Sequence, residues 1–228
     1  MKVGITERGD AGLDLSWLDK VKDGKVDGCI AITKAPSKLV DLDIPDNIVI
    51  HCTITGLGGS IYEPNVKEPS ETIEAYLSLV QKYGGERVVL RIDPIIMGAA
   101  IHPTAVAEHT KGRVRISFLD MYSHVLSRLE KANAHIPHET FHAPIEARYE
   151  IVESLTETLG FPPEICGEPG FPCTGCVSER DLLAMGIMEK GTPGGRQRST
   201  CCCLAEKVEL LKNKHPCKHN CLYCYWKS

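Results

Sequence analysis

The chain has 228 residues, of which 43% are hydrophobic and 25% are charged, with a formal net charge of -4. This length suffices for one domain with a full core, or for a domain with an appendage. No apolar run approaches the ~20 residues that a membrane-spanning helix needs, so we expect no membrane segment. Its 11 cysteines fall below the density of a disulfide scaffold, and no signal peptide is recognisable, so we expect a reducing cytoplasm.

The charge is unevenly distributed along the chain. Residues 1–186 hold 18 Lys and Arg against 27 Asp and Glu, a net charge of -9. Residues 187–228 hold 8 against 3, a net charge of +5, and they surround several of the cysteines. This basic end either offsets the charge of a metal cluster, meets an anionic substrate, or forms an ordinary solvated surface.

Short β-branched runs alternate with helical patterns. In chain order, we predict strands at 2–6, 29–33, 48–55, 88–92, 114–118 and 164–166. We predict helices at 14–21, 37–41, 70–83, 122–133 and 144–159, with Ser70 as an N-cap and Gly160 as a stop signal. Repeated strand–helix units favour parallel strands.

These units predict an α/β protein built as a partial (β/α)6-type, TIM-like barrel, and a doubly wound open sheet is the alternative. Residues 1–160 are expected to form the barrel body. Residues 161–228 are expected to form a cysteine-rich segment packed on the barrel mouth.

Polar residues follow the predicted strands, and ligands of parallel α/β folds bind at the carboxyl ends of strands. Arg91 and Asp93 are unusual, because strand interiors in parallel sheets are normally apolar. A buried arginine needs a carboxylate, so this pair either binds itself or clamps the carboxylate of a ligand. The candidate catalytic residues are Lys34, Arg91, Asp93 and Asp120, and the candidate cofactor-binding residues at strand ends are Glu7, Thr33, Thr55 and Ser117.

The last twelve residues contain Cys217, Cys221 and Cys224 in a C-x3-C-x2-C pattern. Three thiolates so spaced can hold three corners of a [4Fe–4S] cluster, which takes cysteine ligands and leaves one iron open. S-adenosylmethionine can chelate that iron, and its reductive cleavage gives a 5′-deoxyadenosyl radical that abstracts hydrogen from a substrate. The spacing resembles the signature of radical S-adenosylmethionine enzymes, in which the aromatic at the position of Tyr223 lies near the adenine.

Such an enzyme needs an electron donor of the flavodoxin or ferredoxin type and a small-molecule or nucleotide substrate. The alternative is a zinc-stapled module in which His215 or His219 supplies a fourth ligand. Its basic tail would then bind nucleic acid, with bases stacked on Tyr223, Tyr225 and Trp226. The two ideas merge if the radical enzyme acts on a nucleotide or DNA base.

A second cysteine group occupies the segment that precedes this tail. Cys173 and Cys176 form a C-x2-C pair, Cys166 lies just before them, and Cys201 and Cys203 can point the same way in an extended run. Cys173, Cys176, Cys201 and Cys203 are therefore candidates for a second iron–sulfur cluster or a structural zinc ion, with free thiols as the plain alternative. Cys29 and Cys52 lie in predicted strands and are expected to be core residues.

Several motifs together resemble an uncharacterised bacterial and phage family whose domain has no assigned function. They are ITERGDAG, AITKAP, CTITGLGGSIYEPNV, ERVVLRIDPII, ISFLDMYSHV, RSTCCC and HPCKHNCLYCYWKS. The resemblance implies a relation to radical S-adenosylmethionine enzymes in which the cysteine triad closes the chain. It carries over to Thr33-Lys34, Arg91-x-Asp93-Pro94, Ser117-Phe-x-Asp120 and Cys201-x-Cys203. The chain departs from the family pattern at Glu7-Arg8-Gly-Asp10 and in the additional Cys202.

Overall fold

The structure is a computed structural model that describes residues 1–139, 141–194, 200–211 and 217–227. Its strands are β1 (Lys2–Ile5), β2 (Gly28–Thr33), β3 (Ile48–Thr53), β4 (Val88–Ile95), β5 (Val114–Phe118), β6 (Glu164–Ile165) and β7 (Glu206–Glu209). Its helices are α1 (Ser16–Lys22), α2 (Pro69–Tyr83), α3 (Thr104–Ala107), α4 (Ser123–Lys131), α5 (Ile145–Leu159) and α6 (Glu179–Ala184), with a 3₁₀ turn at Pro36–Lys38.

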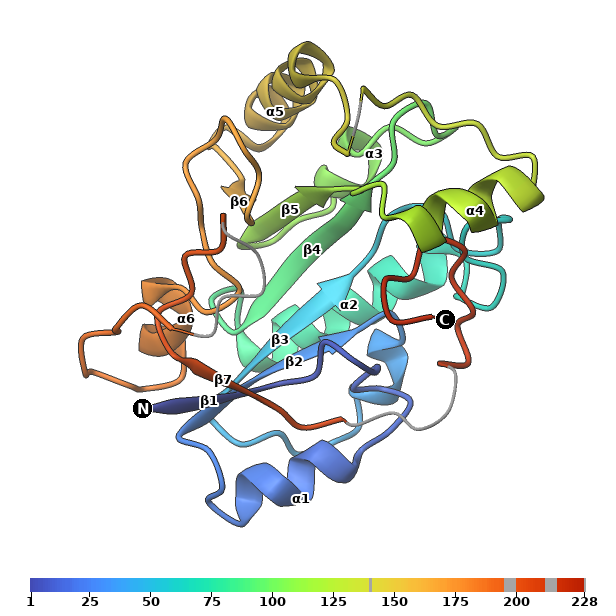
Figure 1. Ribbon diagram of the computed structural model, residues 1–228. Coiled ribbons are helices and arrows are strands. Elements are labelled where there is room, and N and C mark those ends of the chain that lie inside the picture. Colours follow the sequence, from blue (N-terminus) through green and yellow to red (C-terminus); the bar gives the residue numbers. More distant parts are fainter. Residues whose placement is uncertain (140, 195–199, 212–216, 228) are drawn as a thin grey trace.

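The seven strands form one curled, parallel sheet in the order β6-β5-β4-β3-β2-β1-β7 (Figure 1). The α/β class and the barrel-like curvature are thereby confirmed. Because β6 and β7 are the two edges, the sheet is a half-barrel. The six predicted strands are all present, and β7 is an additional one.

Strand β7 places the end of the chain. It pairs with β1 in parallel, from Lys2 opposite Glu206 to Ile5 opposite Glu209. Its carboxyl end therefore lies at the same edge of the sheet as the carboxyl ends of the other strands. Cys217 follows Glu209 by eight residues, so the chain leaves β7 close to the mouth of the half-barrel. Segment 161–228 thus supplies both edge strands as well as both cysteine groups.

The helix predictions are right in outline and wrong at particular ends. Ser70 is not the N-cap of α2, because Pro69 occupies the first turn and Glu68 is the cap residue. Proline is preorganised for that first position, where its missing N–H costs no hydrogen bond. The helix predicted at 37–41 is the short 3₁₀ turn, and the sequence patterns did not reveal α3 or α6.

The outer face of the sheet carries the main apolar core. Residues at alternate positions, such as Ile50 of β3 and Leu90 of β4, pack with Trp17 of α1, Leu79 of α2 and Leu155 of α5. Cys29 and Cys52 are fully buried in this core, as expected. No helix of the described residues is long and apolar enough to cross a membrane.

The inner face changes character along the strands. Towards the amino ends it is apolar, with Val3, Val49 and Val89 packed against Leu182 of α6. Further along β4 and β5, the same face carries Arg91, Asp93, Arg115 and Ser117, since side chains alternate between faces with a period of two. Of the polar residues expected at strand ends, Arg91, Asp93 and Ser117 thus lie on the inner face of the strands.

A buried ionic network fastens α6 to this inner face. Arg113, directly before β5, and Arg115 of β5 both donate to the Glu164 carboxylate, and both donate to Asp181 of α6, at 2.8 and 2.9 Å. The Asp181 side chain is fully buried and also completes a capping box with Ser178. The arginines lower the pKa of Asp181 well below its usual range despite the opposing effect of burial. Removing one partner would leave buried charge uncompensated.

We expect Asp181→Ala to lower the free energy of unfolding by about 3–5 kcal/mol, the cost typical of breaking a buried ion pair. Urea unfolding followed by circular dichroism measures this. Glu86→Ala is the matched control, because Glu86 and Arg180 form an exposed pair. It should cost no more than about 1 kcal/mol. Equal losses for the two variants would contradict the structural role given to Asp181.

Candidate functional site

The cysteine-bearing tail, residues 217–227, lies across the carboxyl ends of the strands beside α4 (Figure 1). The Leu222 amide donates to the Tyr62 carbonyl oxygen at 2.9 Å, in the loop after β3. Cys221 and Tyr223 are buried there with Leu57, among other apolar side chains. The tail is therefore an integral cap on the mouth.

One anchor of the tail is Asp10, in the loop after β1. His219 Nε2 lies 2.9 Å from Asp10 Oδ2, and both residues are buried. The same carboxylate accepts from the Thr33 hydroxyl and the Lys34 amide, each at 2.6 Å. Burial opposes ionisation, but His219, Thr33 and Lys34 together lower the pKa of Asp10. Thr33, a predicted cofactor residue, thus helps to join β1, β2 and the tail.

A second anchor is the buried Glu63 carboxylate. Glu63 Oε1 accepts from Lys34 Nζ at 2.7 Å and from the Tyr223 hydroxyl. Lys34 Nζ also lies 5.6 Å from the centroid of the Tyr223 ring. Burial disfavours each charge, yet the Lys34 charge lowers the pKa of Glu63, and the Glu63 charge raises the pKa of Lys34. A fixed positive charge is therefore held beside Tyr223 at the mouth.

The three tail thiols share one electrostatic environment. Burial raises the pKa of Cys221 to about 12; the Lys34 charge opposes this, whereas Cys217 and Cys224 reinforce it. Burial likewise raises the pKa of Cys217, and the His219 backbone amide donates to its sulfur. Cys217 and Cys221 therefore lie within electrostatic reach of Cys224 and of Lys34.

Arg128 of α4 holds the tail from the other side. Its guanidinium donates to the carbonyl oxygens of Leu222 at 2.8 Å, Lys227 at 2.7 Å and Cys224. Asp120 contributes through the backbone, because its amide donates to the Tyr225 hydroxyl at 2.8 Å. The Asp120 carboxylate itself lies 2.8 Å from His142 Nδ1 and is buried. Asp120 therefore acts on the tail through Tyr225.

The second cysteine group lies deeper in the half-barrel. Cys166 Sγ and Cys176 Sγ are 3.4 Å apart, and Cys203 is hydrogen-bonded to Cys176. Cys173 is instead joined to Cys202 by a disulfide, and Cys201 is a free, buried thiol. The predicted set of Cys173, Cys176, Cys201 and Cys203 is thus not brought together as one group. Instead, Cys166 lies with Cys176 and Cys203 in a group of three thiols.

Glu7 belongs with these deeper cysteines. Its carboxylate lies 3.4 Å from Lys207 Nζ and is hydrogen-bonded to Cys176. Burial raises the pKa of Glu7 to about 7, with the Cys176 charge reinforcing the shift. Arg91 also lies within electrostatic reach of Cys176 and Glu7. Glu7 and Arg91 therefore face the deeper cysteines.

An ion pair links the two cysteine groups along β4. Arg91 binds Asp93 through its guanidinium, and each side chain is less than one fifth exposed. The Asp93 charge in turn raises the pKa of Lys34, after the larger effects of burial and Glu63. Since positions 91 and 93 share one face of β4, they bridge the deep thiols and the mouth. The pairing of Arg91 with Asp93, one of the two readings of the sequence, is what the geometry shows.

The remaining predicted residues take supporting positions. Thr55 is hydrogen-bonded to Glu63 and also accepts from the Leu57 amide at 3.2 Å. Ser117 is buried on β5. The sequence did not point to Glu63 or Arg128. Glu63 lies in a loop, Arg128 lies on α4, and neither belongs to a recognisable motif. His215 lies outside the described residues.

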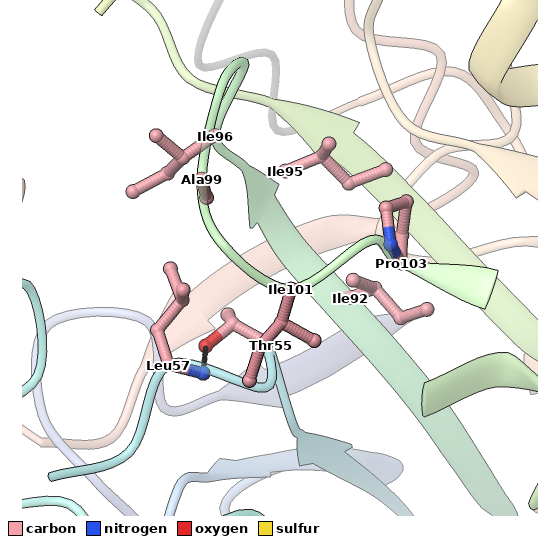
Figure 2. Close-up of a pocket in the computed structure, with 8 residues that line it drawn as sticks. All are labelled: Thr55, Leu57, Ile92, Ile95, Ile96, Ala99, Ile101 and Pro103. Carbon is pink, nitrogen blue, oxygen red and sulfur yellow. Dashed lines mark hydrogen bonds between the residues drawn. The ribbon is translucent and has the colours of Figure 1, made fainter. Parts of the chain in front are cut away.

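Two cavities in the described part of the chain lie near this edge of the sheet, and neither lies between the cysteine groups. The first is bounded by Thr55, Leu57 and the apolar end of β4 (Figure 2). Its volume is about 10 Å³, which is close to the minimum for a single water. The second, about 250 Å³, lies beside α4 around Leu129 and His138. Neither cavity combines volume with the candidate site residues.

The tail offers three cysteine thiols as metal ligands, and a metal site also requires its ligands to lie close together. Within the described parts of the chain, no group of three or more His, Cys, Asp or Glu side chains is already arranged to hold a metal ion. A single zinc ion needs four ligands drawn to about 2.0–2.3 Å. A four-iron cluster is larger, so its thiolate ligands stand further apart. Cysteine thiolates are ligands of zinc and of iron–sulfur clusters alike, so the donor type of the tail is compatible with either.

The fold and site define an α/β half-barrel whose mouth is capped by a cysteine-bearing tail. The family model for the domain of unknown function DUF1848 matches residues 18–226, and the chain belongs to that family. The match includes both cysteine groups, whereas Glu7 and Asp10 precede it. No curated protein and no solved structure matches the chain.

Replacing Arg128 with alanine should loosen the tail without unfolding the sheet. Hydrogen bonds from a charged donor are worth about 1.5–3 kcal/mol each, so exchange of the tail amides should accelerate at least about tenfold. Hydrogen–deuterium exchange of residues 217–227, read by mass spectrometry, measures this. Lys131→Ala, at the exposed end of the same helix, should leave the exchange rate unchanged. Unchanged exchange in Arg128→Ala would show that the guanidinium does not hold the tail.

Proposed function

We propose that this protein is a radical S-adenosylmethionine enzyme whose [4Fe–4S] cluster is held by Cys217, Cys221 and Cys224. The observation that carries the proposal is the setting of the triad: the three thiols belong to the tail that caps the strand ends, and the partly buried Lys34 lies within electrostatic reach of Cys217 and Cys221. A bound cluster with an open iron supplies the electron that cleaves S-adenosylmethionine into methionine and a 5′-deoxyadenosyl radical.

The chain's own residues have distinct tasks in this proposal. Lys34 offsets the negative charge of the thiolates, and Glu63 fixes the position of its ammonium group. Tyr223 is buried and bound to Glu63, so it positions the ligand loop; the adenine contact expected of this residue is an additional proposal. Asp93 and Arg91 pair with each other just inside the mouth, and the proposal has this pair open to orient the charged groups of a bound ligand or substrate.

His219 supports an open iron over a closed zinc site. In the zinc alternative, His219 is the candidate for the fourth ligand that lies within the described residues. Its Nε2 instead lies 2.9 Å from Asp10 Oδ2, and its backbone amide donates to the Cys217 sulfur. Because His219 is engaged by Asp10, it is not a ready fourth ligand, and this supports a fourth position open to a small molecule. This favours the arrangement that a radical enzyme requires.

The nucleic-acid-binding alternative has less support from the tail. Tyr223 is buried and bound to Glu63, and Tyr225 is bound to the Asp120 amide. Trp226 is exposed, but its ring already lies 4.8 Å from the Arg8 guanidinium. Stacking of successive bases needs several free aromatic faces. A nucleotide remains one of the substrate classes that the mouth is proposed to receive, beside other small molecules.

The proposal predicts a specific loss in Cys221→Ala. The full chain, reconstituted anaerobically with iron and sulfide, should show visible charge-transfer absorption and form 5′-deoxyadenosine from S-adenosylmethionine and dithionite. Outer-shell partners of a metal are already worth about 10–100-fold, so loss of a ligand should reduce 5′-deoxyadenosine by more than about a hundredfold. Liquid chromatography with mass detection measures the product.

Cys29→Ala is the matched control, because Cys29 is a core residue on the outer face of the sheet. It should form 5′-deoxyadenosine at the wild-type rate. If Cys221→Ala forms as much 5′-deoxyadenosine as the wild type, the proposed function fails. A colourless protein with stoichiometric zinc and salt-sensitive DNA binding would instead establish the binding module.

A further inference from the structure

Two of the deep cysteines have their sulfur atoms in direct contact. Cys166 Sγ and Cys176 Sγ lie 3.4 Å apart, and both residues are less than one tenth exposed. Because a disulfide bond is about 2.05 Å long, the two sulfur atoms need to approach each other by only about 1.4 Å to form one. Each cysteine can contribute to that approach by a small rotation about its single side-chain torsion. The pair is therefore placed for a bond between its sulfurs.

Backbone hydrogen bonds fix both members of this pair. The Cys166 amide donates to the Ile116 carbonyl oxygen of β5 at 2.9 Å, and the Thr174 amide donates at 2.6 Å to the carbonyl oxygen of the residue before Cys166. Arg115 donates from Nη1 to the Cys176 carbonyl oxygen at 3.1 Å. The contact between the two sulfurs is thus set by the fold.

A third segment, which carries Cys202 and Cys203, crosses the second at Gly175. A Cβ at position 175 would lie 2.7 Å from the backbone nitrogen and the Cα of Cys203, which are atoms that cannot turn aside. At this crossing Cys203 is hydrogen-bonded to Cys176, whereas Cys202 forms a disulfide with Cys173. Cys176 is therefore the central thiol of the deep group.

We propose that Cys166 and Cys176 form a site of reversible oxidation, at which a peroxide converts the two thiols into a disulfide. Cys176 reacts first, because it is 8% exposed, against 4% for Cys166 and 1% for Cys203. The positive charges of Arg91 and Lys207 lie within electrostatic reach of its sulfur and favour the thiolate, which is the nucleophilic form of cysteine. Cys166, whose sulfur is 3.4 Å away, is the thiol that completes the bond.

The reaction has two steps and consumes one peroxide. The Cys176 sulfur attacks a peroxide oxygen, so that an S–O bond forms and the O–O bond breaks. With hydrogen peroxide, the thiol proton leaves with the departing oxygen as water. The Cys166 sulfur then attacks the resulting sulfenic acid, an S–S bond forms, the S–O bond breaks, and a second water leaves. The two thiols lose two electrons and the peroxide gains them. A dithiol restores both thiols by thiol–disulfide exchange.

Oxidation of this pair changes the inner face of the half-barrel. Glu7 is hydrogen-bonded to Cys176, and Arg91 lies within electrostatic reach of both sulfurs. A disulfide carries neither a thiol proton nor a thiolate charge, so its formation removes the group that Glu7 and Arg91 face. Since Arg91 also binds Asp93, the modification changes the surroundings of the ion pair just inside the mouth. The site does not depend on the cluster proposed for the tail.

Thiol labelling of the full-length protein tests the inference. The protein is purified without oxygen, reduced with dithiothreitol, freed of reductant and metal, and treated stepwise with hydrogen peroxide. In denaturant, free thiols are alkylated with iodoacetamide, and disulfide thiols are alkylated with N-ethylmaleimide after reduction. Fragment-ion mass spectrometry locates each label. Cys201 is the matched control in the same chain, because it is a free thiol and is 7% exposed, close to the 8% of Cys176.

We expect Cys166 and Cys176 to acquire the disulfide label together, at least about tenfold faster than Cys201, since a thiol next to a resolving cysteine is oxidised selectively. Dithiothreitol should remove this label. Cys203→Ser should keep the bond, because Cys166 and not Cys203 is the partner. Disulfide label on Cys203 in place of Cys166, its loss from Cys176 in Cys203→Ser, or equal labelling of Cys176 and Cys201 would overturn the proposal. The labelling requires no cluster and no S-adenosylmethionine, so its failure leaves the proposed function standing.

Discussion

The site depends on one constraint: every strand, including the edge strand β7, runs in the same direction. Because β7 is parallel to β1, the chain leaves it at the carboxyl edge of the sheet. The tail can then reach Asp10 after β1, Lys34 after β2 and Glu63 after β3. Had β7 been antiparallel, its end would lie at the opposite edge, near α6. Strand direction thus brings a triad at the end of the chain to the edge where ligands of parallel sheets bind.

Charge connects the two cysteine groups. The inner face of the half-barrel is too polar for a simple core, and its charges are arranged in order from the deep thiols to the mouth. Arg91 faces Cys176 and Glu7, Asp93 binds Arg91, and Lys34 follows Asp93 towards Cys221. Each buried charge has a partner of opposite sign, as burial requires. Because side chains alternate between faces along β4, Arg91 and Asp93 share the inner face, where this pair lies between the two cysteine groups.

The sequence predicted the parts whose signal is local. β-Branched runs located six strands, and cysteine spacing located the triad, because both patterns depend on neighbouring residues. Residues brought together by folding were not predictable in this way. Glu63 lies in a loop without a motif, and Cys176 meets Cys203 where two segments cross at Gly175. β7 was missed because three of the four residues in its sequence EKVE are charged, which an edge strand tolerates. The alternation expected of Cys201 and Cys203 correctly separates Cys202, which turns to Cys173.

The central claim is that the tail triad holds an open iron that binds S-adenosylmethionine. Electron–nuclear double resonance on the reduced wild-type protein, with S-adenosylmethionine labelled with ¹⁵N at its amino group, tests this directly. The account predicts a ¹⁵N coupling to the reduced cluster in the wild type and no such coupling in the Cys221→Ala variant. A reduced cluster without ¹⁵N coupling in the wild type, or a coupling that survives in Cys221→Ala, would contradict it.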